Sequence, residues 1–320
     1  MPVRNAESHL PEALQTIFAQ DWPNLELIAV DDGSQDRSPR ILAEAARTPA
    51  GSERRMRILR QEGRGVATAR NAGIAEASGE FILLADADDR CHAGLVSAGM
   101  AALARAPAAQ LVFARCRYID ADGAVEAVQA VMPDWIGTER LLEGLMVNTP
   151  LLRRAAGEAV GWHDAQMTGS VDLDLFVRLT LRHGACLHAL PEVLSDYRRS
   201  GGQITSDWRR MERTWREVRD KAVAQGFTPS RRGRSRMRGR HCAYWATLAY
   251  AAGEYRAAQR LIAEAAWRDP LYVMSDELAR VRALACAAAL LPAPLHAAIR
   301  ARFNARRIAA PPQPLGDESP

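Results

Sequence analysis

The stretch LELIAVDDGS, residues 25–34, decides the fold, because a mainly apolar run ends abruptly in two carboxylates and a glycine. The stretch FILLADADD, residues 81–89, repeats this arrangement. A short apolar run bounded by turn residues predicts a buried strand. Residues i and i+2 of an extended segment point the same way, so Asp86 and Asp88 can direct both carboxylates at one cation. Hard cations such as Mg²⁺ and Mn²⁺ prefer oxygen ligands, and the two stretches therefore indicate a metal or nucleotide site.

Helical and extended patterns alternate from the amino terminus to about residue 118, which favours an α/β domain with a mainly parallel central sheet. In open sheets of this kind, ligands gather at the carboxyl ends of the strands, where both acidic clusters lie. Residues 119–207 mix the two patterns. The expected strands are 25–30, 56–59, 81–85 and 111–118, and the expected helices include 65–77, 94–105, 138–146 and 173–183.

The chain from Trp208 to about residue 309 reads as helical and is rich in alanine and arginine. Within it, Gly253, Tyr255, Ala258 and Ala265 fall at the offsets of one tetratricopeptide-like helix pair. A lone repeat cannot bury both of its faces. Two interpretations are therefore open, a helical cap packed on the α/β domain and a peptide-binding array. Residues 310–320 are rich in proline and are predicted to be disordered.

Composition limits the class of protein. The chain has 320 residues, of which 48% are hydrophobic, enough for one large domain and an accessory one. The cysteines lack paired spacing, so they indicate neither a disulfide framework nor a zinc site and favour a reducing cytoplasm. No run approaches the ~20 apolar residues of a membrane-spanning helix. The net charge is only +4, but residues 231–240 are rich in arginine. This segment is either a solvated helix face or a surface that binds phosphate groups or anionic lipid.

Five segments occur in an order that resembles a known family. They are PVRNAE at 2–7, VDDGS at 30–34, GVATARNAG at 65–73, DADD at 86–89 and DLDL at 172–175. A single Asp-x-Asp pair arises by chance in most proteins, but five segments in order are specific. On these residues the chain is similar to glycosyltransferase family 2 over about residues 2–205. The resemblance implies the GT-A fold and the transfer of a sugar from a nucleotide sugar, usually with inversion.

The resemblance also implies a division of the chain and a set of site residues. It implies a transferase domain over 1–207, with a nucleotide-sugar-binding half over 1–118 and an acceptor half over 119–207, before the helical region 208–309. Asp86 and Asp88 resemble the pair that binds Mn²⁺ or Mg²⁺, a Lewis acid for the leaving diphosphate, with Asp88 in direct contact. Asp31 and Asp32 resemble the uracil-side and ribose-side carboxylates. The implied nucleotide-sugar-binding residues are Pro2, Asn5, Glu7, Asp31, Asp32, Arg70 and Asp86.

Asp172 matches the aspartate that acts as general base in the family. In that role it removes a proton from the acceptor hydroxyl while the oxygen attacks the anomeric carbon. An aspartate at the start of an apolar helix is also an ordinary N-cap, and this alternative stays open.

Several other polar residues have ordinary structural explanations. Asp36 and Asp164 are expected to cap turns, and Asp174 is expected to pair with Arg178 one helical turn later. The histidines that lack metal-ligand spacing, and that we interpret as structural, are His163, His183 and His188.

The sequence departs from the family pattern at three places. The family has an apolar strand before the segment that contains Pro2 and Asn5, and here that strand is absent, which would leave backbone groups of the sheet unpaired. We therefore expect a start codon assigned too far downstream, unless the upstream reading frame lacks an apolar segment of about six residues. Val171 replaces the glutamate that precedes the base, and Ser200 stands near the position of a histidine in many relatives.

These features predict an inverting, metal-dependent glycosyltransferase, with a UDP-sugar as donor and a hydroxyl of a cell-surface polysaccharide or glycolipid as acceptor. The expected partners are the nucleotide sugar, a glycan or lipid-linked acceptor and a divalent cation, without a nucleic acid. The expected location is the cytoplasm, with peripheral association at the inner membrane face as an alternative. Nucleotidyl transfer is disfavoured because its Gly-rich signature with a nearby lysine is missing. A non-catalytic or decayed GT-A-like protein, which binds a nucleotide or a protein partner, is the remaining alternative.

Overall fold

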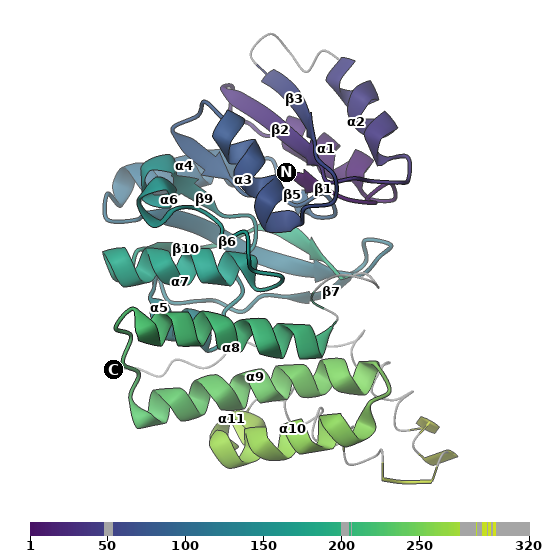
Figure 1. The fold of residues 1–320 in the computed structure, drawn as a ribbon, viewed down its shortest axis with the longest axis vertical. Helices are drawn as coiled ribbons and strands as arrows, with labels where there is room; N and C mark the ends of the chain where they lie inside the picture. The colour runs from purple at the N-terminus through teal and green to yellow at the C-terminus, as the bar shows by residue number, and fades with distance from the viewer. Residues whose placement is uncertain are drawn as a thin grey trace. The chain divides into compact units, whose positions relative to one another are not determined.

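The structure is a computed structural model that describes residues 1–47, 54–199, 205, 207–275, 286, 290–292, 294, 295, 297 and 298. Ser200 and the tail 310–320, for which the sequence predicts disorder, lie outside these residues. The chain forms two compact units (Figure 1). The first comprises Met1–Gly137 and Val147–Ser200, and the second comprises Thr138–Met146 and the helices that follow residue 201.

The first unit begins with a small parallel sheet in the order β1-β2-β3. Its strands are β1 (Pro2–Val3), β2 (Leu25–Asp31) and β3 (Arg54–Arg60). Val30 and Asp31 of β2 register with Pro2 and Val3 of β1. The apolar run in LELIAVDDGS therefore forms a buried strand that ends in a carboxylate, as the sequence predicts.

Three helices connect the first strands, namely α1 (Leu10–Phe18), α2 (Ser38–Arg47) and α3 (Val66–Glu76). The helix α1 buries Leu10, Leu14 and Ile17 on one face, which is the pattern of an amphipathic helix. The helix α3 lies close to β2, since a Cβ added at Gly73 would stand 3.2 Å from a methyl group of Val30. Close packing at Gly73 is what brings the first turns of α3 to the end of β2.

A mixed sheet forms the rest of the first unit, with β4-β9-β6-β10-β5 as its path, β7 beside β6 and β8 beside β10. Among the described strands of this sheet, only β6 and β10 pair in parallel. The α/β class is confirmed, but the sheet is mixed where the sequence predicted a mainly parallel one, because the hairpin β6–β7 and the strands β9 and β10 were not anticipated. The strands are β4 (Phe81–Leu83), β5 (Arg90–Cys91), β6 (Leu111–Ile119), β7 (Val125–Val128), β8 (Trp135–Ile136), β9 (Leu151–Arg153) and β10 (Leu187–Arg198). The helices are α4 (Leu95–Arg105), α6 (Arg154–Val160) and α7 (Val171–His183).

One apolar cluster joins these elements and includes Leu14 of α1, Leu27 of β2, Leu103 of α4 and Val112 of β6. The strand β1 is short, and among the described residues no strand pairs with residues 25–27 on the β1 side of β2.

The second unit is helical in the part of it that the structure describes. Its helices are α5 (Thr138–Leu142), α8 (Trp208–Ala224), α9 (Arg231–Ala251), α10 (Tyr255–Arg268) and α11 (Pro270–Ser275). Asp207 caps α8 by accepting from the N–H groups of Arg209 and Arg210, and Ser230 caps α9 by accepting from the N–H of Gly233. Of the helices within the described ranges, none is both long enough and apolar enough to cross a bilayer.

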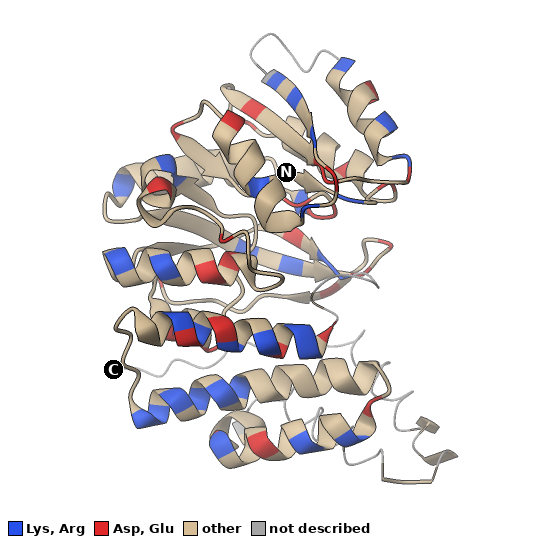
Figure 2. Ribbon diagram, in the orientation of Figure 1, with Lys and Arg blue, Asp and Glu red and all other residues tan. Residues whose placement is uncertain are grey.

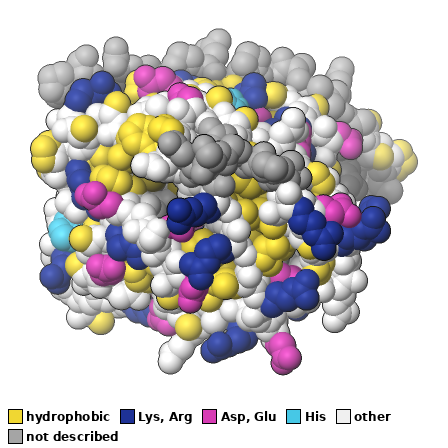
Figure 3. Space-filling view, turned by 90° about the horizontal axis from the view of Figure 1, so that it is seen from above, with side chains coloured by type: hydrophobic (Ala, Val, Ile, Leu, Met, Phe, Trp, Pro, Cys, Tyr) yellow, Lys and Arg dark blue, Asp and Glu magenta, His cyan; other side chains and the backbone are white. Residues whose placement is uncertain are grey.

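Arginines fill the amino-terminal half of α9, which Figure 2 draws in blue. The buried carboxylate of Glu143 accepts from Arg236 and from Arg240, and Arg238 donates to Glu264 at 2.9 Å. Half of the arginine run is therefore engaged in ion pairs within this unit. The exposed members are Arg231, Arg232 and Arg234. On the face that Figure 3 shows from above, basic and acidic side chains are scattered among apolar ones.

Candidate active site

The carboxylates that follow the apolar run of β2 are buried and hydrogen-bonded to the loops around them. Asp32 Oδ1 accepts from Gln61 Nε2 at 2.6 Å and from the N–H of Arg64 at 2.7 Å, and its Oδ2 accepts from the N–H of Gly65 at 2.9 Å. Asp31 accepts from a backbone N–H of the following turn at 3.0 Å. Asp32 is only 3% exposed, and because its carboxylate accepts these three hydrogen bonds, it fixes the loop that leads into α3.

The segment after β1 lies against the turn that follows Asp32. Asn5 Oδ1 accepts from a backbone N–H of that turn at 2.8 Å. The Glu7 carboxylate accepts from the backbone N–H and the Nε of Arg37 at 2.9 and 3.1 Å. Asp36 accepts from the N–H groups of Ser38 and Glu7, so its predicted role in capping the turn is confirmed. Asn5 and Glu7 thus hold this segment in place through their side chains.

Arg70 of α3 connects two carboxylates that come from different parts of the chain. Its guanidinium donates to Asp86 at 2.6 Å and also to Asp172. The Arg70 side chain is 6% exposed, whereas those of Asp86 and Asp172 are 35% and 36% exposed. Burial opposes the charge of Arg70, but Asp172 and Asp86 outweigh it and raise the pKa of the guanidinium. A permanent cation therefore lies beneath two carboxylates that open to solvent.

Asp172 lies in the first turn of α7, where the aligned peptide dipoles favour a negative charge. Ser170, and not Asp172, occupies the N-cap position. Desolvation raises the pKa of Asp172, but the charge of Arg70 and the hydrogen bond from His163 outweigh it, so the pKa lies below its usual value. Asp172 is therefore ionised, as a general base must be, and its basicity is low while these two partners contact it.

His163, which the sequence analysis interprets as a structural residue, contacts the predicted base Asp172. Its Nε2 lies 3.1 Å from Asp172 Oδ1, and its side chain is 0% exposed. The Asn71 side chain fixes the backbone of His163, donating to its carbonyl at 2.7 Å and accepting from its N–H at 3.1 Å. A single histidine nine residues before an aspartate has no periodic signal. Asn71, directly after Arg70, lies in one of the five predicted segments, and only the structure shows that it binds this loop.

Arg198, the last residue of β10, fixes the acidic loop after β4. Its Nε donates to the carbonyl of Asp88 at 2.9 Å, and its backbone N–H donates to Asp89 Oδ1 at 2.8 Å. The other guanidinium nitrogens donate to two carbonyls of the turn after β6 and to Glu12 at 2.6 Å. Burial, with the charges of Asp86 and Asp88, raises the pKa of Asp89 well above its usual value. The backbone of the Asp-x-Asp segment is thus held by a fully buried arginine.

Asp86 and Asp88 fit a divalent cation that shares its ligands with a substrate. Within the described ranges, no three His, Cys, Asp or Glu side chains come together as a metal cluster. Mg²⁺ usually binds one or two protein carboxylates and takes its other ligands from water and from substrate phosphates. Two partly exposed carboxylates after β4 satisfy that requirement without a protein cage.

The helix α3 joins the two groups into which the structure divides the predicted site residues. Asp32 accepts from the N–H of Gly65 just before α3, and Arg70 follows about one helical turn after Val66. The first group, around the turn after β2, is Pro2, Asn5, Glu7, Asp31 and Asp32. The second group, around the guanidinium, is Arg70, Asp86 and Asp172, with Asp88 in the loop that contains Asp86.

Two solved structures resemble this fold. TarS 1–349 of S. aureus in complex with UDP-GlcNAc gives a TM-score of 0.58 at 14% identity, over 95% of this chain and 90% of that chain. The mannosyltransferase PcManGT from Pyrobaculum calidifontis, in complex with GDP-Man and Mn²⁺, gives a TM-score of 0.59 at 19% identity, over 96% and 85%. At these identities the likeness shows the fold alone, and the expected GT-A fold is confirmed.

Sequence comparison gives the family. The glycosyltransferase EpsH of Bacillus subtilis (strain 168) is 39% identical over 87 residues, which are 27% of this chain and 24% of EpsH. The match thus spans about a quarter of that relative's length. The family model described as glycosyl transferase family 2 matches residues 1–164, more than half of the chain. The chain therefore belongs to glycosyltransferase family 2.

Proposed function

We propose that the protein is an inverting, metal-dependent glycosyltransferase that moves a sugar from a nucleotide diphosphate sugar to a hydroxyl acceptor. One observation carries this proposal: Arg70 contacts both Asp86, in the predicted metal-binding pair, and Asp172, the predicted base. The residues for the leaving diphosphate and for the incoming hydroxyl thus meet at one guanidinium. Family membership supports the same reaction class.

In the proposed reaction, Asp172 accepts the proton of the acceptor hydroxyl. The acceptor oxygen forms its bond to the anomeric carbon while the bond from that carbon to the diphosphate oxygen breaks, which inverts the centre. Asp86 and Asp88 would bind a divalent cation, whose chemistry when bound is to stabilise the charge of the leaving diphosphate. His163 orients the Asp172 carboxylate through its Nε2.

Arg70 couples donor binding to the basicity of Asp172. While Arg70 donates to Asp172, it lowers the pKa of that carboxyl and makes it a weak base. A diphosphate offers the guanidinium a more highly charged, bidentate partner. As Arg70 turns to the diphosphate, its hold on Asp172 weakens and the carboxylate becomes more basic. The base is thereby activated after the donor has bound.

The donor class that we propose is a nucleoside diphosphate sugar, with UDP as the expected nucleotide. TarS is solved with UDP-GlcNAc and PcManGT with GDP-Man, which supports a nucleoside diphosphate sugar as the donor class. A screen of nucleotide sugars would identify the nucleobase. We propose a cell-surface polysaccharide or a glycolipid as the acceptor, and residues 1–207 as the part that carries the transfer. The proposed location is the cytoplasm or the inner membrane face.

Calorimetry of UDP binding, with and without Mn²⁺ or Mg²⁺, tests the donor side of the proposal. We expect binding that depends on the metal in the parent protein and loses this dependence in Asp88→Ala. Asp122→Ala, in the exposed turn between β6 and β7, is the matched control and should bind as the parent does. UDP binding indifferent to the metal and to Asp88 would refute the enzyme and favour a non-catalytic nucleotide-binding protein.

A further inference from the structure

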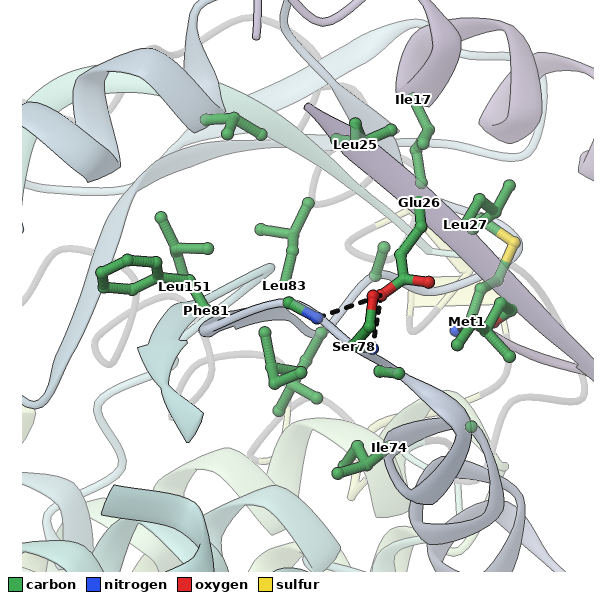
Figure 4. Close-up of a pocket in the computed structure, with 18 of the residues that line it drawn as sticks. Met1, Ile17, Leu25, Glu26, Leu27, Ile74, Ser78, Phe81, Leu83 and Leu151 are labelled. Carbon is green, nitrogen blue, oxygen red and sulfur yellow. Dashed lines mark hydrogen bonds between the residues drawn. The ribbon is translucent and has the colours of Figure 1, made fainter. Parts of the chain in front are cut away.

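The helical unit exposes large apolar side chains where α10 is followed by α11. In the first unit, apolar side chains such as those of Leu25 and Phe81 line a cavity of about 720 Å³ (Figure 4). In the helical unit, Trp267, Leu271 and Met274 are instead 86%, 69% and 68% exposed. Large apolar side chains that are exposed together, and not singly, mark a surface that binds a partner. These three residues are the apolar corner of the unit.

The helical periodicity places the apolar corner on the outer side of both helices. In α10, a line of exposed residues at spacings of three and four positions ends at Trp267, whereas Ala265 is buried on the other side of the helix. In α11, Leu271 and Met274 are three residues apart and share one face, whereas Val273 is buried. Each helix therefore packs one side against the unit and presents apolar side chains to solvent on the other.

Exposed arginines lie beside the apolar corner. The hydroxyl of Ser235 donates to the carbonyl of Arg268 at 2.8 Å, which fixes the first turns of α9 against the end of α10. Arg231 and Arg232 precede Ser235 by four and three residues, so they lie on the same side of α9 as Ser235, one turn earlier. Arg231, Arg232 and Arg268 are all exposed. Three cationic side chains therefore flank the residues that begin at Trp267.

Positive charge is in excess around the apolar corner. From Arg231 to Met274 the chain has nine arginines and three acidic residues, and it keeps an excess of arginine when Asp276 and Glu277, which follow in the sequence, are added. The three acidic residues form ion pairs within the unit, Glu254 with Arg209, Glu264 with Arg238 and Asp269 with Arg240. The exposed arginines of α9 and α10 that form no ion pair within the described part of the chain are Arg231, Arg232, Arg234, Arg256 and Arg260.

We propose that the apolar corner and the arginines beside it form a docking surface for a lipid bilayer that contains anionic lipids. Trp267, Leu271 and Met274 insert at the level where headgroups meet acyl chains, which is the depth that exposed tryptophans prefer. Arg231 and Arg232 remain at the headgroups, where a guanidinium can donate two hydrogen bonds to one lipid phosphate. Apolar insertion and charge attraction then act on the same small surface.

A bilayer fits this surface better than a protein or a nucleic acid does. A stable protein interface takes about 20–30 residues from each side, more than the corner and its arginines supply. A nucleic acid would pair with the arginines but would leave the three apolar side chains in water. A bilayer accommodates both kinds of side chain. Docking would bring the chain to a lipid-linked acceptor, a consequence that rests on the proposed function, while the docking surface itself does not.

Co-sedimentation of the 320-residue chain with vesicles tests the charge of the surface. We expect vesicles with about 30% phosphatidylglycerol to bind the protein at least about tenfold more tightly than pure phosphatidylcholine, and added salt to weaken that binding. Arg231→Gln together with Arg232→Gln should weaken it by about 30-fold. The matched control, Arg105→Gln with Arg182→Gln, changes two exposed arginines of the first unit and should bind as the parent does. Equal weakening in both double variants, or no binding by the parent, would overturn the proposal.

Fluorescence tests whether the apolar corner enters the bilayer. Lipids brominated on their acyl chains quench a tryptophan that inserts beside them. We expect quenching in the parent and in Trp135→Phe, which changes an exposed tryptophan of the first unit, and its loss in Trp267→Phe, which keeps an apolar ring and should still sediment with the vesicles. Quenching that persists in Trp267→Phe would overturn the proposal. Self-association in solution that Trp267→Ser abolishes, without binding to vesicles, would show that a second copy covers the corner and would also overturn it.

Discussion

The stability of the helical unit should fall as the pH drops from about 7.5 to about 5, because His241 is buried in its neutral form. The His241 ring packs against the indoles of Trp215 and Trp245, with ring centroids 4.5 and 5.3 Å away, and the residue is 8% exposed. Burial, reinforced by the charge of Arg238, lowers its pKa from 6.5 to about 3.

The size of the effect follows from proton binding in the two states. In the unfolded chain the imidazole titrates at its ordinary pKa of 6.5, whereas in the folded unit it stays neutral until the pH nears about 3. Below pH 6.5 the unfolded state binds the extra proton, so the free energy of unfolding falls as the pH falls. The loss is close to zero at about pH 7.5 and reaches about 2 kcal/mol at about pH 5.

Hydrogen exchange of α9 amides at the two pH values measures this loss, after correction for intrinsic exchange rates. We expect the opening equilibrium of α9 to shift by a factor of about 30, which corresponds to about 2 kcal/mol. His241→Phe retains an aromatic ring against the two indoles and should remove most of the shift. His183→Phe alters an exposed histidine and should leave the shift intact. An equal shift in the parent and in His241→Phe would refute the reasoning.

Three further outcomes are expected. Asp172→Asn should lower kcat for sugar transfer by about 10²–10⁴-fold, since it removes the proton acceptor. Calorimetry should show UDP binding no weaker than in the parent, because Arg70 no longer has to leave a charged partner, and an unchanged kcat would contradict the role of Asp172. Arg198→Lys should weaken metal-dependent UDP binding by about tenfold, because a lysine cannot donate to the carbonyl of Asp88 and to Glu12 at the same time. The control Arg105→Lys, at an exposed arginine, should leave UDP binding unchanged. Glu143→Gln should lower the free energy of unfolding of the helical unit, measured in urea, by about 2 kcal/mol, because it leaves partly buried arginines without their anion. An equal loss in Glu217→Gln, at an exposed glutamate, would contradict this.

The strand ends that carry the site could be predicted because their signal is local. In β2 a buried apolar run is followed at once by acidic residues, and the same pattern marks β4 and its loop. The long strand β10 could not be predicted in this way. Pro191 and Glu192 interrupt its apolar residues, and the ladder with β6 absorbs them through register shifts between Leu190 and Ser195. Bulges of this kind depend on the neighbouring strand, which sequence periodicity does not contain.

Contacts between distant residues were beyond the sequence patterns for a different reason. Periodicity shows which face of a helix is buried, but it does not name the partner on the other side. Arg198 and Glu12 are 186 residues apart, and their ion pair requires β10 to end beside α1. Residues 138–146 likewise lie in the helical unit, where Glu143 meets arginines more than 90 residues later in the chain. Only the folded topology brings these charges together.

The first unit has two buried arginines near the acidic loop after β4, Arg70 in α3 and Arg198 at the end of β10, and their contacts differ. Arg198 donates its guanidinium hydrogen bonds to backbone carbonyls and to Glu12, so it holds the loop that contains Asp88 in a fixed position. Arg70 has only two carboxylate partners, both more than a third exposed, and its Nε finds no acceptor among the described residues. The Arg70 guanidinium can therefore bind a new anion through its remaining N–H group, while its carboxylate partners turn to solvent and the core stays packed. Under the proposed function, Arg70 is thus the residue at which an incoming diphosphate would alter the site, while Arg198 keeps the loop that contains Asp88 in place.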